Sequence, residues 1–204
     1  MVEAKAVRFL RTKTLVIILL PSLLWTLLLL LMPYSASFVL LLKIILWGIP
    51  AYLYPKLANN INANKFFLLN KPPKGKLILI SVVFLVTYSA LINVGRLEVK
   101  PVSLFYIVSA FVMSPVIEEM AFRGVILQML HQFIGWTYAN VTTAILFMLY
   151  HIPLWLVRGQ SVSVMGCLWV VFFAVCMGFV MFQSKSLWTC IIIHAIQNVL
   201  FGIL

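Results

Sequence analysis

The sequence predicts an all-α fold, a polytopic transmembrane helix bundle of about seven spans that forms one integral membrane domain. The first reason is composition, because 64% of the 204 residues are hydrophobic and only 9% are charged. A soluble domain has about 25% charged residues, and a disordered chain is far less apolar. The second reason is that the apolar residues form long runs separated by short basic segments. The three cysteines, all within apolar runs, are too few for a disulfide scaffold.

Seven apolar runs are long enough to be membrane spans, with boundaries good to about two to four residues. The second run is the least regular, because it carries Lys43 and Pro50. Lys43 lies near the start of that run, so we expect its long side chain to extend toward the membrane interface. The runs are 15–32, 38–54, 77–95, 104–130, 135–157, 164–182 and 186–204.

The basic residues predict the orientation. Lys and Arg total 15 against four acidic residues, which gives a net charge of +11. Nucleic acid is excluded as a partner, because these residues lie in short segments between apolar runs, as in cytoplasmic loops that contact anionic lipid. An N-terminus inside and a C-terminus outside give the inside segments ten basic residues and the outside segments three. The inside residues are Lys5, Arg8, Arg11, Lys13, Lys56, Lys65, Lys71, Lys74, Lys76 and Lys185, and the outside residues are Arg96, Lys100 and Arg158.

Three charged residues interrupt the fourth run. Glu118, Glu119 and Arg123 fall within six residues, and each costs at least about 2.5–3.5 kcal/mol at mid-bilayer. Glu119 and Arg123 are spaced i,i+4, so one helix face brings them together as a pair. Glu118 is rotated by about 100° and has no partner at that spacing, so it must find other polar groups or take up a proton. Pro115, three residues earlier, predicts a kink or a restart of the helix.

The required polar groups occur in two later runs. His151 lies in the fifth run, and His194 and Asn198 are spaced i,i+4 in the last. One Glu, two His and one Asn on three helices predict a shared polar cavity, suited to acid–base chemistry, to metal binding, or to both. For His151 to reach the depth of Glu118, we expect the fifth helix to begin near Asn140.

Three motifs occur in order along the later runs, namely Glu118-Glu119-x-x-x-Arg123, Phe147-x-x-x-His151 and His194-x-x-x-Asn198. Taken together, they resemble the CPBP family of intramembrane proteases. This family is also called the CAAX-protease and bacteriocin-processing, or Abi, family, and it includes the Ras-converting CAAX endopeptidase. The resemblance covers about residues 104–204, which we interpret as the catalytic helix bundle, whereas residues 1–103, with about three spans, carry no motif.

The resemblance implies a role for each catalytic residue. Glu118 would be the general base that activates a water molecule, and His151 would help to hold that water. His194 and Asn198 would polarise the scissile carbonyl and stabilise the oxyanion, which is worth several kcal/mol in a site that excludes bulk water.

Glu119 and Arg123 would form a supporting pair that positions the first Glu. A metal site stays open as an alternative, because Glu118, His151 and His194 would supply the His2Glu ligands of catalytic zinc. The enzyme would then be a metalloendopeptidase. Without a metal it would be a glutamate-type peptide hydrolase, and the sequence does not separate the two.

The predicted function is therefore an intramembrane endopeptidase that cuts a membrane-associated peptide or protein, expected in a bacterial cell membrane. The alternative is a non-catalytic membrane scaffold, or a bacteriocin self-immunity protein, of the same fold. A small transporter or proton path ranks third, because the sequence has no repeat symmetry and few polar residues in its first three spans. The sequence does not determine the substrate, the cleavage site, a requirement for prenylation or the oligomeric state.

Overall fold

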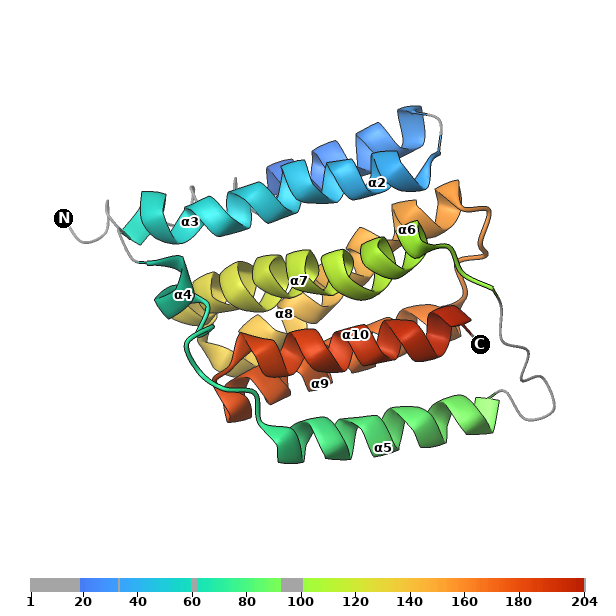
Figure 1. The fold of residues 1–204 in the computed structure, drawn as a ribbon. Helices are drawn as coiled ribbons and strands as arrows, with labels where there is room; N and C mark the ends of the chain where they lie inside the picture. The colour runs from blue at the N-terminus through green and yellow to red at the C-terminus, as the bar shows by residue number, and fades with distance from the viewer. Residues whose placement is uncertain (1–18, 33, 60–61, 93–100, 204) are drawn as a thin grey trace.

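Every regular element in the part of the chain that the structure describes is a helix, which confirms the predicted fold class. The structure is a computed structural model, and it describes residues 19–32, 34–59, 62–92 and 101–203. In it, η marks a stretch of wider π-helix. The first helix is Leu19–Leu31. It is followed by α2 (Ala36–Lys43), η1 (Ile44–Gly48), α3 (Ile49–Asn59), α4 (Ala63–Phe66), α5 (Gly75–Ile92), α6 (Leu104–Tyr106), η2 (Ile107–Met113), α7 (Ser114–Glu119), η3 (Met120–Ile126), α8 (Leu127–Val157), α9 (Val164–Ser184) and α10 (Leu187–Ile203) (Figure 1).

Several of these helices suit a bilayer. Four helical stretches of the described chain are long and apolar enough to cross one, namely Ala36–Lys56, Gly75–Ile92, Leu104–Val157 and Val164–Ser184. Leu19–Leu31 and Leu187–Gly202 are shorter apolar helices. The count of seven spans and the orientation remain predictions. Part of the orientation argument concerns residues outside those described, namely Lys5, Arg8, Arg11, Lys13, Arg96 and Lys100.

A single glycine divides the longest helical stretch. Gly135 has φ 74° and ψ 166°, a conformation that is essentially restricted to glycine, and helix resumes on both sides of it. The predicted break between the fourth and fifth runs is therefore present. The predicted start of the fifth helix near Asn140 is wrong, because one glycine completes the turn and no further loop residues are needed.

π-Helical stretches occur beside the charged residues. Lys43 ends α2 immediately before η1, and the Glu118–Glu119 pair ends α7, between η2 and η3. Pro115 lies in the first turn of α7, where η2 gives way to α-helix. A proline cannot donate a backbone hydrogen bond, and π-helical turns are typical of functional sites. The disturbance predicted from Pro115 thus takes the form of a change in helix type.

Close packing of the C-terminal helices positions the site. The second half of α8 packs against α9, and α10 packs against α5, α7 and α9, with α2 and α3 on the far side of α7 (Figure 1). A Cβ atom at Gly178 would overlap the Asn140 carboxamide, so this glycine permits the close approach of α9 to α8. The first helix is attached through Trp25, which is fully buried. Its Nε1 donates to the Tyr150 carbonyl at 2.9 Å, and its ring stacks on the Tyr150 ring.

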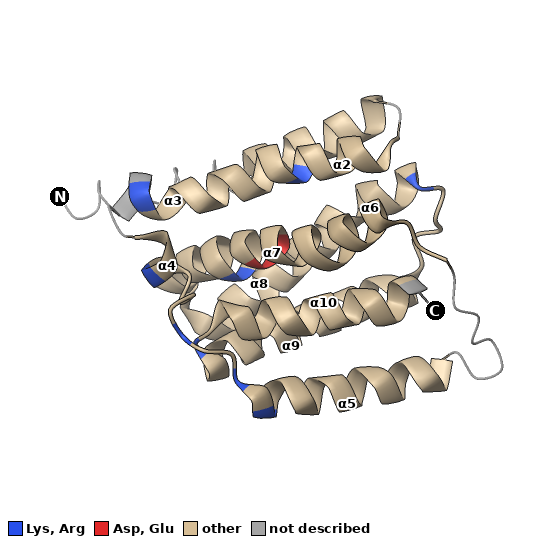
Figure 2. Ribbon diagram, in the orientation of Figure 1, with Lys and Arg blue, Asp and Glu red and all other residues tan. Residues whose placement is uncertain are grey.

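Basic side chains gather at one end of the bundle, around α3, α4 and the start of α5 (Figure 2). Two hydrogen bonds of 3.0 Å join this end to the start of α10, from Ser186 Oγ to the Lys71 carbonyl and from the Lys74 amide to Thr189 Oγ1. Arg158 follows α8 at the opposite end. The described basic residues are therefore distributed unequally between the two ends, as the prediction of orientation assumes.

Candidate active site

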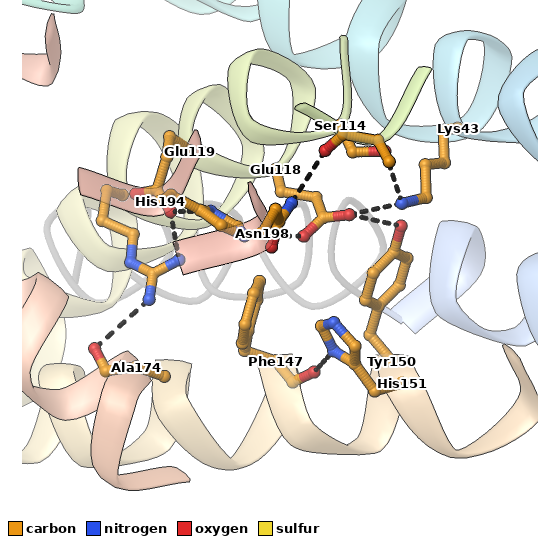
Figure 3. A network of polar contacts seen from close by, with 12 residues as sticks. Lys43, Ser114, Glu118, Glu119, Phe147, Tyr150, His151, Ala174, His194 and Asn198 are labelled. Carbon is orange, nitrogen blue, oxygen red and sulfur yellow. Dashed lines mark hydrogen bonds and ion pairs between the residues drawn. The ribbon is translucent and has the colours of Figure 1, made fainter. Parts of the chain in front are cut away.

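Two adjacent carboxylates lie at the centre of the bundle, at the end of α7. Glu118 is 3% exposed and Glu119 is fully buried. Because successive residues of a helix are rotated by about 100°, the two side chains enter different surroundings (Figure 3).

Glu119 lies in a closed cluster of polar groups. Its Oε1 accepts from Arg123 Nη1 at 2.9 Å, which is the i,i+4 ion pair that the spacing predicts. His194 Nδ1 lies 2.7 Å from the same oxygen. The other arm of the guanidinium donates to the Ala174 carbonyl of α9 at 3.3 Å, and its plane lies over the Phe147 ring at 4.7 Å. This cluster therefore joins α7, η3, α9 and α10.

Glu118 is paired with a residue that the sequence did not connect with it. Lys43 Nζ lies 2.5 Å from Glu118 Oε1 and also donates to Ser114 Oγ at 2.9 Å. The hydroxyl of Tyr150 approaches the same carboxylate oxygen at 3.4 Å. The other oxygen, Oε2, lies 3.7 Å from Nε2 of His194. His194 therefore lies between the two carboxylates.

The prediction that Glu118 must find polar groups away from its own i,i+4 spacing is confirmed, because its cationic partner comes from another helix. The prediction about Lys43 is wrong. Lys43 does not extend to the interface, because it is only 6% exposed and points into the bundle. The physical reason is that a buried carboxylate attracts a flexible lysine more strongly than the interface does, once folding brings α2 beside α7.

His151 and Asn198 each use part of their hydrogen-bonding capacity on the backbone. His151 Nδ1 lies 2.7 Å from the carbonyl of Phe147, one turn earlier, which leaves Nε2 as the nitrogen that can act on a ligand. Asn198 Nδ2 donates to the Ala110 carbonyl of η2 at 2.8 Å, and a second N–H remains on that nitrogen.

One cavity of about 330 Å³ joins the four predicted catalytic side chains. Its lining includes Glu118, His151, His194 and Asn198, together with Lys43. The predicted supporting pair, Glu119 and Arg123, does not line it. The arrangement suits proton transfer at one carboxylate with imidazole and carboxamide groups nearby.

The geometry does not assemble the predicted zinc ligands. Within the described residues, no three His, Cys, Asp or Glu side chains are grouped so that they could hold a metal ion. Glu118 Oε1 faces the Lys43 ammonium, and His194 Nδ1 faces Glu119. The His2Glu set of Glu118, His151 and His194 therefore does not fit a metal in this arrangement.

Sequence reasoning also missed Ser114 and Tyr150, which contact Lys43 and Glu118. Neither residue stands out from its run, because hydroxyl groups are common in membrane helices. Lys43 did carry a usable signal. An ionisable residue inside an apolar run is a functional candidate by default, and its acidic partner must then be sought on another helix.

The comparisons with known proteins concern the C-terminal half of the chain, which contains the cavity residues except Lys43. A family model described as type II CAAX prenyl endopeptidase Rce1-like matches residues 100–200. Residues 100–200, about half of the chain, are similar to this family. The Rce1-like region contains Glu118, His151, His194 and Asn198, and it leaves Lys43 outside. No curated protein and no solved structure matches the chain.

The match confirms the resemblance predicted from the three motifs. Together with the apolar helices, it indicates an integral membrane protein of a protease family, and hence a lipid bilayer and a membrane-associated substrate as its partners.

Proposed function

We propose that the protein is an intramembrane endopeptidase that hydrolyses a peptide bond in a membrane-associated peptide or protein, with Glu118 as the general base. The observation that carries the proposal is the single cavity shared by Glu118, His151, His194 and Asn198. The match of the Rce1-like family to the same residues supports it.

The reaction begins with a water molecule held between Glu118 Oε2 and His151. Glu118 takes a proton from the water as its oxygen bonds to the scissile carbonyl carbon, and the carbonyl oxygen becomes an oxyanion. The carbon–nitrogen bond then breaks, and Glu118 passes its proton to the leaving amine. Neither carboxylate carries a net change in protonation at the end of the cycle.

His194 and Asn198 stabilise the oxyanion in this proposal. Because an ionised carboxylate only accepts hydrogen bonds, Glu119 holds a hydrogen on His194 Nδ1. A second proton on Nε2 then gives a donor that points into the cavity. The N–H of Asn198 that is not bound to Ala110 supplies the other donor.

Glutamate-type chemistry is favoured over a metalloendopeptidase by the donor set. The three residues that a zinc site would require are not grouped as ligands, whereas a carboxylate, two imidazoles and a carboxamide line one cavity. We also propose a bacterial cell membrane as the location of the enzyme.

One observation favours the alternative, a non-catalytic scaffold or self-immunity protein of the same fold. The ion pair with Lys43 occupies an oxygen of the carboxylate that the reaction needs as a base. In the alternative, both carboxylates would be structural and their exact basicity would not matter.

Replacing two cavity residues in turn tests the proposed function. Full-length protein in membranes is assayed against a panel of membrane-anchored peptides with the wild type, Glu118→Gln and His151→Ala. General-base catalysis contributes about 10²–10⁴-fold, so we expect Glu118→Gln to reduce cleavage by a factor in that range. Cleavage that persists in both variants would overturn the proposal. A cellular phenotype that Glu118→Gln fully retains would favour the scaffold.

A further inference from the structure

Lys43 is the one described residue of the first hundred that enters the network around Glu118 with a charge. It lies at the end of α2, immediately before η1, and its side chain is almost completely buried. Its ammonium contacts Glu118 Oε1 and Ser114 Oγ, and it lies 5.8 Å from the centre of the Tyr150 ring (Figure 3). Its partners Ser114, Glu118 and Tyr150 all lie in the Rce1-like region, whereas Lys43 does not.

Such a lysine is expensive to place in a membrane bundle. A charged lysine at the centre of a spanning helix costs at least about 2.5–3.5 kcal/mol. The cost is offset only where a counter-ion and further hydrogen-bond acceptors are arranged around it. Glu118 supplies the charge and Ser114 the acceptor, and Ser114 lies one turn before Glu118 on the same helix. The ammonium is therefore held at two points on α7.

The contacts distinguish the two oxygens of Glu118. Lys43 and Tyr150 both engage Oε1. Oε2 lies 3.7 Å from His194 Nε2, beyond hydrogen-bond distance. Fixing one oxygen also fixes the plane of the carboxylate, and with it the direction in which the second oxygen points.

We propose that Lys43 is a positioning residue, which holds Oε1 of Glu118 so that Oε2 is presented to the cavity. The inference rests on the proposed function and extends it to a residue outside the family match. The first half of the chain then supplies part of the active site, and the Rce1-like half is incomplete without it. Lys43 acts through Glu118 and does not touch the reacting atoms.

Kinetics on the full-length protein in membranes test this role. The substrate is a membrane-anchored peptide that the wild type cleaves and Glu118→Gln does not. We expect Lys43→Met to lower kcat about 10–100-fold, because small errors of position at a reacting group can cost about 10²-fold. KM should change little. Lys43→Arg, which retains a charged donor, should recover most of the lost kcat.

Two further variants keep the test decisive. Lys56→Met removes an exposed lysine from the next helix and should leave kcat and KM unchanged. Ser114→Ala removes the anchor of Lys43 but keeps both charges, so it should lower kcat by less than about tenfold even if Lys43→Met folds poorly. Wild-type kcat in both Lys43→Met and Ser114→Ala would overturn the inference and leave the role of Glu118 intact.

A spectroscopic readout needs no substrate. Infrared difference spectra of wild type minus Glu118→Gln isolate the carboxylate stretch of Glu118. In Lys43→Met we expect this band to be replaced by the C=O stretch of a protonated acid, because a buried carboxylate without its counter-ion takes up a proton. An unchanged carboxylate band would overturn the inference. If no peptide is cleaved by the wild type, the proposed function fails while this measurement still decides the pairing.

Discussion

The polar network has two parts, one around Glu118 and one around Glu119, and the surroundings of these adjacent glutamates differ. Glu119 is enclosed by Arg123, His194 and the α9 backbone, and it does not reach the cavity. Glu118 lines the cavity, with one oxygen held by Lys43 and the other 3.7 Å from His194 Nε2. A rotation of about 100° along α7 separates a closed ion pair from an accessible carboxylate. The two glutamates therefore have different surroundings, and under the proposed function only Glu118 reacts.

The cations reinforce this difference. A guanidinium stays charged in any protein environment, so Arg123 needs a permanent counter-ion. Lys43 lines the cavity and Arg123 does not, so the pair of Lys43 and Glu118 is the one that a ligand in the cavity can reach. The pair of Glu119 and Arg123 is therefore suited to stabilising the fold, and the pair of Lys43 and Glu118 to the proposed reaction.

The largest expected effect is on stability, at Glu119. Glu119→Gln leaves the Arg123 charge buried without a counter-ion, which costs about 3–5 kcal/mol of unfolding free energy. Glu118→Gln is the matched control and should cost less, because Lys43 lines the cavity, where water can solvate its charge, and Arg123 does not. Denaturant unfolding in detergent micelles, followed by tryptophan fluorescence, measures both. Equal losses of unfolding free energy in the two variants would show that the two carboxylates do not differ in their contribution to stability.

His194 contacts both carboxylates, so its removal should affect both regions. We expect His194→Ala to lower kcat about 10²–10³-fold, as the loss of an oxyanion donor does. It should also lower the unfolding free energy, since Glu119 Oε1 loses one of its two partners. Peptide cleavage and detergent unfolding are measured on the same preparation. A loss of stability alone would assign His194 to the closed cluster only.

A smaller effect is expected where α9 approaches α8. Gly178→Ala forces a Cβ atom into the Asn140 carboxamide, and overpacking of this kind costs about 1–3 kcal/mol. The displaced α9 also carries Ala174, the backbone acceptor for Arg123. Gly178→Ala should therefore weaken the contacts of Glu119 and Arg123 more than it disturbs the residues that line the cavity. Gly75→Ala is the control, because a Cβ atom at Gly75 meets nothing within 4 Å.

The smallest effect is expected at Tyr150. Its hydroxyl lies 3.4 Å from Glu118 Oε1, at the long limit of a hydrogen bond, and Lys43 holds the same oxygen more closely. A neutral hydrogen bond contributes about 0.5–1.5 kcal/mol, so Tyr150→Phe should change kcat by less than about tenfold. Steady-state cleavage in membranes checks this. A loss as large as that of Glu118→Gln would make Tyr150, and not Lys43, the residue that holds the carboxylate.

Local patterns predicted much of the molecule. The apolar runs predicted the helices, and the i,i+4 spacing predicted the pair of Glu119 and Arg123, because these depend on residues within a few turns of one another. The family resemblance rested on three motifs whose order is visible in the chain, and the family match agrees with it. The start of the fifth helix near Asn140 was wrong, because the backbone freedom of Gly135 shortens the turn to one residue.

The sequence by itself determined that the chain is a bundle of apolar helices with a few ionisable groups in its interior, and it identified those on the later helices. Hydropathy and helical spacing are local properties, so they are carried by the order of the residues. Only the tertiary structure decided which cation pairs with which carboxylate. Lys43 and Glu118 are 75 positions apart, and their contact depends on how α2 packs against α7, a long-range arrangement that no local pattern encodes.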